Sequence, residues 1–438
     1  MASTYLSRTI TPSTINKKKF TFSAWVKIDN LTADGDILSF NGSTDYTVLR
    51  IKNADRIDFL TYDGGVQARR VSAAKYRDCS GFYHVVLSVN SDDTTADDRI
   101  KIYVNGERLT AFDSSVNPSS GFEFINNNKV NLNIGSNVDQ TPTRWYFGGI
   151  MSHVHFIDGL TYDASAFGET DSATGQWKIK TSPSVTYGTN GFFILKDGNS
   201  VTDQSGNTNN FTVSGGTLTK TEDNPSNVFA TYNPLGNFFP ADTFSNGNTT
   251  QTTNAGNYTY NISTLGASNG KYYCEIKNST NNNNSIGIAD RPSISTTNGL
   301  TGTTYGWAYV MSGQVYNNGS IVATYNTVTT NDIVGIALDL DNNKVYFSKN
   351  GTWQGSSDPS AGTGGISITD PASNRTGFYF FASGDSATNS AVNQANFGNG
   401  FFGTTAVASA GTNASGNGIF EYDVPTGYTA LSTKGLNL

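Results

Sequence analysis

Aromatic side chains beside polar turns are the residues of this 438-residue chain that are best suited to bind a ligand. Trp145 and Tyr146 follow the polar segment SNVDQTPTR, and Trp353 follows an Asn-Gly turn. Flat amphipathic rings offer a large contact area to a sugar ring and lose little conformational entropy on binding. The three residues are therefore candidate glycan-binding residues. The competing interpretation is that they pack on a hydrophobic core.

A cluster of four aspartates is the second group with chemistry to consider. Asp92, Asp93, Asp97 and Asp98 lie in the segment SDDTTADDR between two predicted strands. Such hard oxygen ligands suit Ca²⁺, but their spacing matches no calcium-loop signature. Solvated acidic residues of a hairpin therefore remain the alternative to a calcium site. We expect the chain to require no cofactor, with Ca²⁺ as the one optional ligand.

The histidines and cysteines indicate structural roles. His153 and His155 are two residues apart and share one face of a predicted strand, but no third metal ligand accompanies them. His84 lies in an apolar strand and is expected to pack or hydrogen-bond inside the fold. Cys79 and Cys274 are far apart and belong to no CxxC motif, so we expect two buried thiols and no disulfide framework.

The elements that must position these residues are β-strands. Apolar residues alternate with polar ones in segments such as 20–26 and 100–104, and Asn-Gly or Asp-Gly turns bound many of them. No helix longer than about two turns is predicted. Short strands at roughly 8–12-residue spacing are typical of antiparallel β-sandwiches. The expected fold class is all-β.

Composition agrees with this fold class and excludes several functions. Charged residues make up 14% of the chain, while it holds 46 Gly, 22 Tyr and 26 Phe. The formal net charge of −7 and the lack of a concentrated basic patch argue against nucleic-acid binding. The sequence has no signal-peptide core and no apolar run of about 20 residues, so we expect synthesis in a cytoplasm and no membrane span.

Two domains are expected. Strand-like segments occupy residues 1–217, and a second dense set occupies residues 236–438, which end in a tail. Residues 218–235 are polar, contain proline and lack periodicity, so they are predicted to form a linker.

The first domain resembles a laminin-G-like, concanavalin-A-type lectin/glucanase sandwich. The resemblance covers roughly residues 1 to 215 and rests on the segments FTFSAWVKI, GFYHVVLSV, RIKIYVNGERL and WYFGGIMSHVHFIDG. Such sandwiches often hold calcium with loop carboxylates. Glycoside hydrolases of this type carry their carboxylates as E-x-D-x-x-E on one strand, and the chain has no such motif. Glu421-Tyr-Asp423 is the one E-x-D match considered, and it lies outside this domain.

The second domain resembles a SPRY domain. GKYYCEIK, SIGIAD, YGWAYVMSGQVYNNGS and DIVGIALDLDNNKVYFSKNGTWQG occur in the order of that family, and Gly335 is expected to allow close packing of a strand. The closing segments NFG and VPTGYTALSTKGLN are similar to the end of SPRY proteins of bacteriophages.

The combination is similar to virion proteins of tailed bacteriophages, marine phages in particular. It implies a non-enzymatic structural protein on the virion surface, with other virion proteins and a host glycan as partners and self-association as a trimer or higher oligomer. The first hypothesis is a tail-fibre or receptor-binding component. The second is a capsid decoration or scaffold protein that contacts only virion partners. The third is a glycan depolymerase, which the missing carboxylate motif disfavours.

Overall fold

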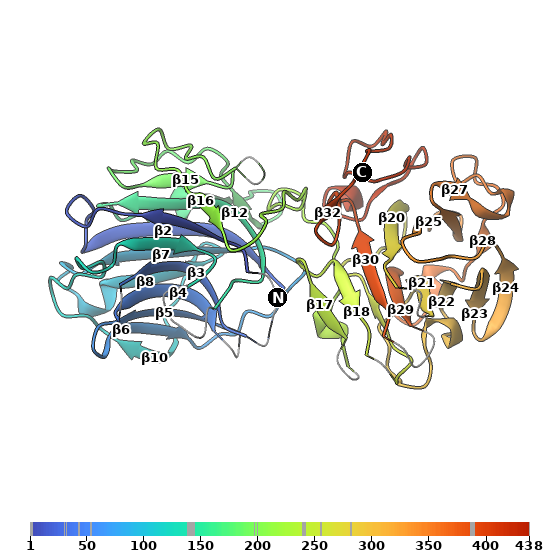
Figure 1. The fold of residues 1–438 in the computed structure, drawn as a ribbon, viewed down its shortest axis with the longest axis horizontal. Helices are drawn as coiled ribbons and strands as arrows, with labels where there is room; N and C mark the ends of the chain where they lie inside the picture. Colours follow the sequence, from blue (N-terminus) through green and yellow to red (C-terminus); the bar gives the residue numbers. More distant parts are fainter. Residues whose placement is uncertain are drawn as a thin grey trace. The chain divides into compact units, whose positions relative to one another are not determined.

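The computed structural model describes residues 3–29, 31, 33–42, 44–52, 55–137, 145–196, 198, 200–238, 242–254, 256–280, 283–385 and 390–437. The chain folds as two compact units, Met1–Lys220 (unit 1) and Thr221–Leu438 (unit 2), each drawn in Figure 1. The described residues form strands, short 3-10 turns and loops, and none of them lies in an α-helix. The prediction of an all-β protein with antiparallel sandwiches is confirmed.

Unit 1 has two large antiparallel sheets. The eight-stranded sheet has the spatial order β10 (Phe112–Val116), β6 (Val66–Ser72), β5 (Arg56–Tyr62), β4 (Tyr46–Lys52), β3 (Gly35–Asn41), β11 (Asn131–Ile134), β1 (Tyr5–Thr9) and β16 (Thr212–Ser214). The six-stranded sheet has the order β15 (Phe192–Ile194), β12 (Gly149–Asp158), β2 (Lys19–Ile28), β7 (Tyr83–Asn90), β8 (Ile100–Val104) and β9 (Glu107–Arg108). A separate hairpin joins β13 (Gly168–Thr170) to β14 (Trp177–Ile179), and 3-10 turns occur at Ala96–Asp98 and Ala164–Ala166.

The core of unit 1 lies between these two sheets. Phe20 of β2 contacts Phe40 of β3, with ring centroids 6.0 Å apart, and both side chains are fully buried. The other face of β2 is also covered, because Trp25 stacks on His84 at 4.6 Å and His84 accepts a hydrogen bond from Trp177 Nε1 at 3.0 Å. The expected internal role of His84 is therefore observed.

Unit 2 is a second sandwich. Its nine-stranded sheet has the order β17 (Thr243–Ser245), β18 (Thr250–Thr252), β30 (Val392–Asn396), β20 (Lys271–Asn278), β25 (Ile333–Asp339), β26 (Lys344–Lys349) and β27 (Thr352–Trp353), with β28 (Ile366–Ser367) on β26 and β33 (Thr429–Ala430) on β20. Its six-stranded sheet has the order β19 (Tyr260–Ile262), β29 (Phe380–Asp385), β21 (Asn284–Ala289), β22 (Gly306–Val310), β23 (Gln314–Asn317) and β24 (Ser320–Thr324). The remaining elements are the pair β31 (Phe401–Phe402) and β32 (Thr405–Ala406), and 3-10 turns at Pro234–Gly236, Leu300–Gly302, Gln354–Ser356, Pro371–Ser373 and Gly435–Asn437.

Two local predictions in unit 2 can be compared with the structure. A Cβ atom on Gly335 would lie 2.4 Å from Ser348 Oγ and 2.8 Å from the Tyr273 hydroxyl, so close packing does require glycine there. Part of the segment predicted as a linker belongs to unit 2, since Phe229 and Tyr232 are buried in its hydrophobic clusters. Among the described residues, no helix has the length and apolar character needed to cross a membrane.

Candidate functional site

The outer face of the eight-stranded sheet of unit 1 carries an unusual row of charged residues. Successive side chains of a strand point to opposite faces, so Arg50 points outward while its neighbours Leu49 and Ile51 enter the core. Strand register places Arg50 of β4 opposite Asp36 of β3 on one side and Asp58 of β5 on the other. Arg69 of β6 continues the row. We call these four residues the charged ladder.

Hydrogen bonds join three members of the charged ladder. Arg50 donates from Nε and Nη2 to Asp58 Oδ2 at 3.1 and 2.9 Å. Arg69 donates from Nε to Asp58 Oδ1 at 3.1 Å and from Nη2 to Oδ2 at 3.0 Å. Burial lowers the pKa of Arg50, but the carboxylates around it, with Asp58 first, hold that pKa above its usual value. The guanidinium of Arg50 is thus a fixed buried cation.

Trp145 lies directly on this row. The Arg50 guanidinium carbon is 4.9 Å from the centroid of the half-buried Trp145 ring, which is a cation–π distance. The backbone fixes the position, because Asp36 N donates to Trp145 O at 3.1 Å. Arg50 Nη1 also lies 3.4 Å from Asp34 Oδ2. A residue chosen from sequence for its ring therefore sits beside a buried ionic network.

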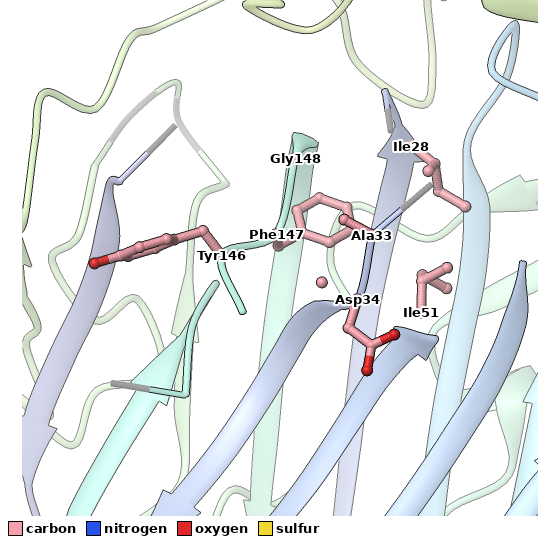
Figure 2. A pocket seen from close by; sticks show the side chains of 8 residues that line it. Ile28, Ala33, Asp34, Ile51, Tyr146, Phe147 and Gly148 are labelled. Carbon is pink, nitrogen blue, oxygen red and sulfur yellow. The ribbon is translucent and has the colours of Figure 1, made fainter. Parts of the chain in front are cut away.

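Tyr146 takes a different position. Its ring pairs with Tyr5 of β1, with centroids 6.2 Å apart, and in Figure 2 its hydroxyl points away from Phe147 and Asp34. A shallow pocket lies between Phe147 and Asp34, at the ends of several strands. Its lining residues are Ile28, Ala33, Asp34, Gly35, Ile51, Tyr146, Phe147 and Gly148.

Buried polar side chains also lie on β3, on β11 and in the loop that follows β11. Asp36 and Asn137 interact through a side-chain hydrogen bond, whereas Nδ2 of Asn133 and Oγ of Ser136 have no partner among the described residues. All four residues are buried. Burial raises the pKa of Asp36 well above its usual value, although Arg50 opposes the shift.

A pair of tyrosines, at the first residue of β4 and the last residue of β5, was not predicted from the sequence. Tyr46 and Tyr62 are opposite each other in the register, and their rings stack with centroids 5.5 Å apart and an interplanar angle of 13°. Both are half-buried. The alternation of the two strands was the available signal, because it places Tyr46 on the face of Arg50 and Tyr62 on the face of Asp58.

Trp353, the third aromatic candidate, belongs to unit 2. It ends the short strand β27, is half-buried and lies edge-on to Tyr273 with ring centroids 6.3 Å apart. Tyr273 is one of the largest fully buried side chains. Of the two sequence-based interpretations of Trp353, core packing has the direct structural support.

The four aspartates predicted as a calcium site have separate partners. Asp98 is 2.5 Å from Arg108, Asp97 is 3.7 Å from Arg70, and Asp92 is 3.7 Å from Lys18. Asp93 Oδ1 accepts the Thr95 N–H at 3.0 Å. In the described part of the chain, no group of three or more His, Cys, Asp or Glu residues is arranged to hold a metal ion. The calcium prediction therefore rests on the sequence of the hairpin.

The carboxylates of the E-x-D match hold backbone groups. Glu421 Oε2 accepts the Ala408 N–H at 2.8 Å, and Asp423 Oδ1 accepts the Thr412 N–H at 2.6 Å. Both carboxylates therefore stabilise the glycine-rich segment that follows β32.

Comparison with known proteins identifies two domains. Residues 3–164 match the family model described as the concanavalin A-like lectin/glucanases superfamily, and residues 271–358 match the SPRY domain model. No curated protein matches the chain.

Solved structures with similar folds include members of both types. The SPRY domain of human HERC1 aligns with 18% identity and a TM-score of 0.31, covering 37% of this chain and 96% of that one. A putative carbohydrate binding protein from Bacteroides ovatus aligns with 18% identity and a TM-score of 0.29, covering 42% and 59%. The CBM40 domain of the Ruminococcus gnavus IT-sialidase, solved with α2,3-sialyllactose, aligns with 22% identity and a TM-score of 0.24, covering 30% and 71%. By the family models, residues 3–164 are similar to the concanavalin A-like lectin/glucanases superfamily and residues 271–358 to the SPRY domain.

Proposed function

We propose that unit 1 binds a glycan on the outer face of its eight-stranded sheet. In this proposal Trp145 stacks on the apolar face of a sugar ring, and the polar groups beside it bond to sugar hydroxyls. The observation that carries the proposal is the position of Trp145, whose half-buried ring lies on Arg50 beside the charged ladder. The match of residues 3–164 to a lectin and glucanase superfamily supports the same function.

The arrangement has the two chemical parts that sugar recognition needs. A sugar presents an apolar ring face and several hydroxyl groups, so an aromatic ring gives contact area and polar side chains give orientation. Hydrogen bonds to Asp58 fix the position of the Arg50 guanidinium, and the cation–π contact with this guanidinium fixes the position of the Trp145 ring. A ring held in advance loses less entropy when the ligand binds.

The test is a binding screen with the full chain. A glycan array identifies the bound sugars, and calorimetry then compares wild type with the Trp145→Ala and Trp353→Ala variants. We expect Trp145→Ala to weaken binding at least tenfold, since truncation of an aromatic anchor commonly costs about 2 kcal/mol or more. Trp353→Ala is the matched control, because it removes a half-buried ring from the other unit, and it should bind as wild type does. Equal affinity of wild type and Trp145→Ala would contradict the proposal, and hydrogen exchange would verify that unit 1 of the variant remains folded.

The finer part of the proposal concerns location. We infer that the protein lies on the surface of a tailed-bacteriophage particle as a self-associating, tail-associated receptor-binding component, and the phage-like segments of its sequence support this. Antibody labelling of intact particles tests the inference. Label at the tail is expected, label confined to the capsid shell would favour the decoration role instead, and absence from particles would refute a virion location.

A further inference from the structure

Two cations face each other next to the charged ladder. Lys52, the last residue of β4, is directly opposite Arg56, the first residue of β5, and strand alternation puts both on the face of Arg50. Like charges directly opposite each other in an antiparallel pair are destabilising. A negative charge beside the pair would therefore reduce the repulsion between the two cations.

The chain compensates Arg56 only in part. Arg56 Nη1 donates to the carbonyl oxygens of Ser72 and Ala73 at 2.6 and 2.5 Å. Its nearest carboxylate is that of Asp113, whose Oδ1 lies 3.9 Å from Nη2 and whose side chain is 62% exposed. An exposed pair at this distance contributes little.

Lys52 is not compensated at all within the described residues. Its half-buried side chain has no hydrogen bond and no ion pair to any of them. The neighbouring Arg50 differs, because its Nη1 lies 3.4 Å from Asp34 Oδ2 and its Nη2 donates to Asp58. Of these two cations on β4, Lys52 is the one without a carboxylate partner among the described residues.

The buried carboxylates of this face are engaged by other residues. Asp34 pairs with Arg50, and Asp58 accepts the hydrogen bonds of Arg50 and Arg69. Asp36 lies on the far side of Arg50 and hydrogen-bonds with Asn137. Lys52 and Arg56 thus lie together without a buried carboxylate of their own among the described residues.

We propose that the glycan bound by unit 1 is acidic, and that Lys52 and Arg56 receive a sugar carboxylate while Trp145 contacts the ring. The proposal rests on the glycan-binding function proposed above and names its ligand class. Arg50 and Lys52 are two residues apart on one strand face, which is about 7 Å. A single acidic sugar, or two joined sugars, can therefore reach from the Trp145 ring to Lys52. The contact would be a charge-assisted hydrogen bond to a cation that is already partly desolvated.

The experiment uses the full chain and two matched pairs of ligands. The first pair is oligogalacturonate and its carboxyl-reduced, neutral form, and the second is sialyllactose and lactose. A glycan array with neutral and acidic members accompanies them. We expect at least one acidic ligand to bind, its neutral partner to bind about tenfold more weakly, and Lys52→Gln to weaken the acidic ligand about tenfold without changing the neutral one. Binding of the acidic ligand should also weaken with added salt.

Lys101→Gln is the control for the lysine substitution, because Lys101 lies on β8 of the six-stranded sheet and should not affect binding. If neutral glycans bind as tightly as acidic ones and Lys52→Gln changes nothing, the acidic-ligand inference is wrong and the glycan-binding function stands. If no glycan of the array or of either pair binds, the glycan-binding function itself is wrong. The Lys52→Gln variant should have the melting temperature of wild type, which would show that a change in affinity does not come from unfolding.

Discussion

The charged ladder makes a direct prediction about stability. Asp58 is completely buried and accepts two hydrogen bonds from Arg50 and two from Arg69. Asp58→Ala would leave the guanidinium of Arg50, whose side chain is 6% exposed, without its main counter-charge. Removal of one partner from a buried ion pair typically costs about 3–5 kcal/mol.

The structure places the expected loss at the lower end of that range. Asp34 lies 3.4 Å from Arg50 and retains part of the attraction, while the side chain of Arg69 is 22% exposed and can regain hydration. We therefore expect Asp58→Ala to lower the free energy of unfolding of unit 1 by about 3 kcal/mol. The double variant Arg50→Met, Asp58→Leu should be less destabilised, because it removes both partners of the fully buried pair and leaves Asp34, which is partly exposed, and Asp36, whose pKa burial raises.

The suitable assay is hydrogen exchange measured by mass spectrometry across a urea series. Peptides of unit 1 report the loss, and peptides of unit 2 serve as an internal control that should not change. A loss below about 1 kcal/mol for Asp58→Ala, or a larger loss for the double variant than for the single one, would refute the ionic account of the charged ladder.

Three further predictions concern pH, metal and packing. Burial raises the pKa of Glu275 and that of Asp385 in unit 2 to about 7, well above their unfolded values of about 4. Both carboxyl groups therefore stabilise unit 2 at low pH, and this stability is lost as the pH rises from about 4 to above 7. Unit 2 should therefore melt higher at pH 5 than at pH 8, and Glu275→Gln should remove about 3 kcal/mol of this difference; a pH-independent melt of unit 2 in wild type would contradict the burial effect. A chelator should leave the melting of unit 1 unchanged, because Asp92, Asp97 and Asp98 have cationic partners within the chain, whereas a lowered melting temperature would indicate a calcium site. Trp353→Ala should lower the stability of unit 2 by about 2 kcal/mol, since the ring packs against Tyr273, and an unchanged melt with lost glycan binding would instead place the glycan site at Trp353.

The class of fold followed from local patterns that the structure confirms. Alternation in 20–26 predicted a strand, and β2 extends over Lys19–Ile28 with Phe20 and Phe22 in the core. The same alternation indicates one solvent-exposed face, yet Ser23 and Trp25 are also buried. Both contact His84, which in turn bonds to Trp177 of a hairpin about 150 residues away, so their burial leaves no local signal.

The candidate site was likewise only partly predictable from the sequence. The ring of Trp145 marked it as a ligand candidate, and the structure places it at a network built from the four strands β3 to β6, which are far from it in sequence. Arg50 stands between Leu49 and Ile51 in an apolar run, where local sequence gives no sign of an ion pair. Its partners, Asp58 and Trp145, become visible only when register and loop position are known. The charged ladder is thus a non-local feature that periodicity cannot reveal.

The structure of a glycan complex tests the central claim most directly. An acidic oligosaccharide selected on the array would be bound to the full chain and its position determined by crystallography or cryo-electron microscopy. We predict a sugar ring against Trp145 and a carboxylate beside Lys52, on the outer face of the eight-stranded sheet. A sugar bound only to unit 2, or only to the six-stranded sheet of unit 1, would contradict the account.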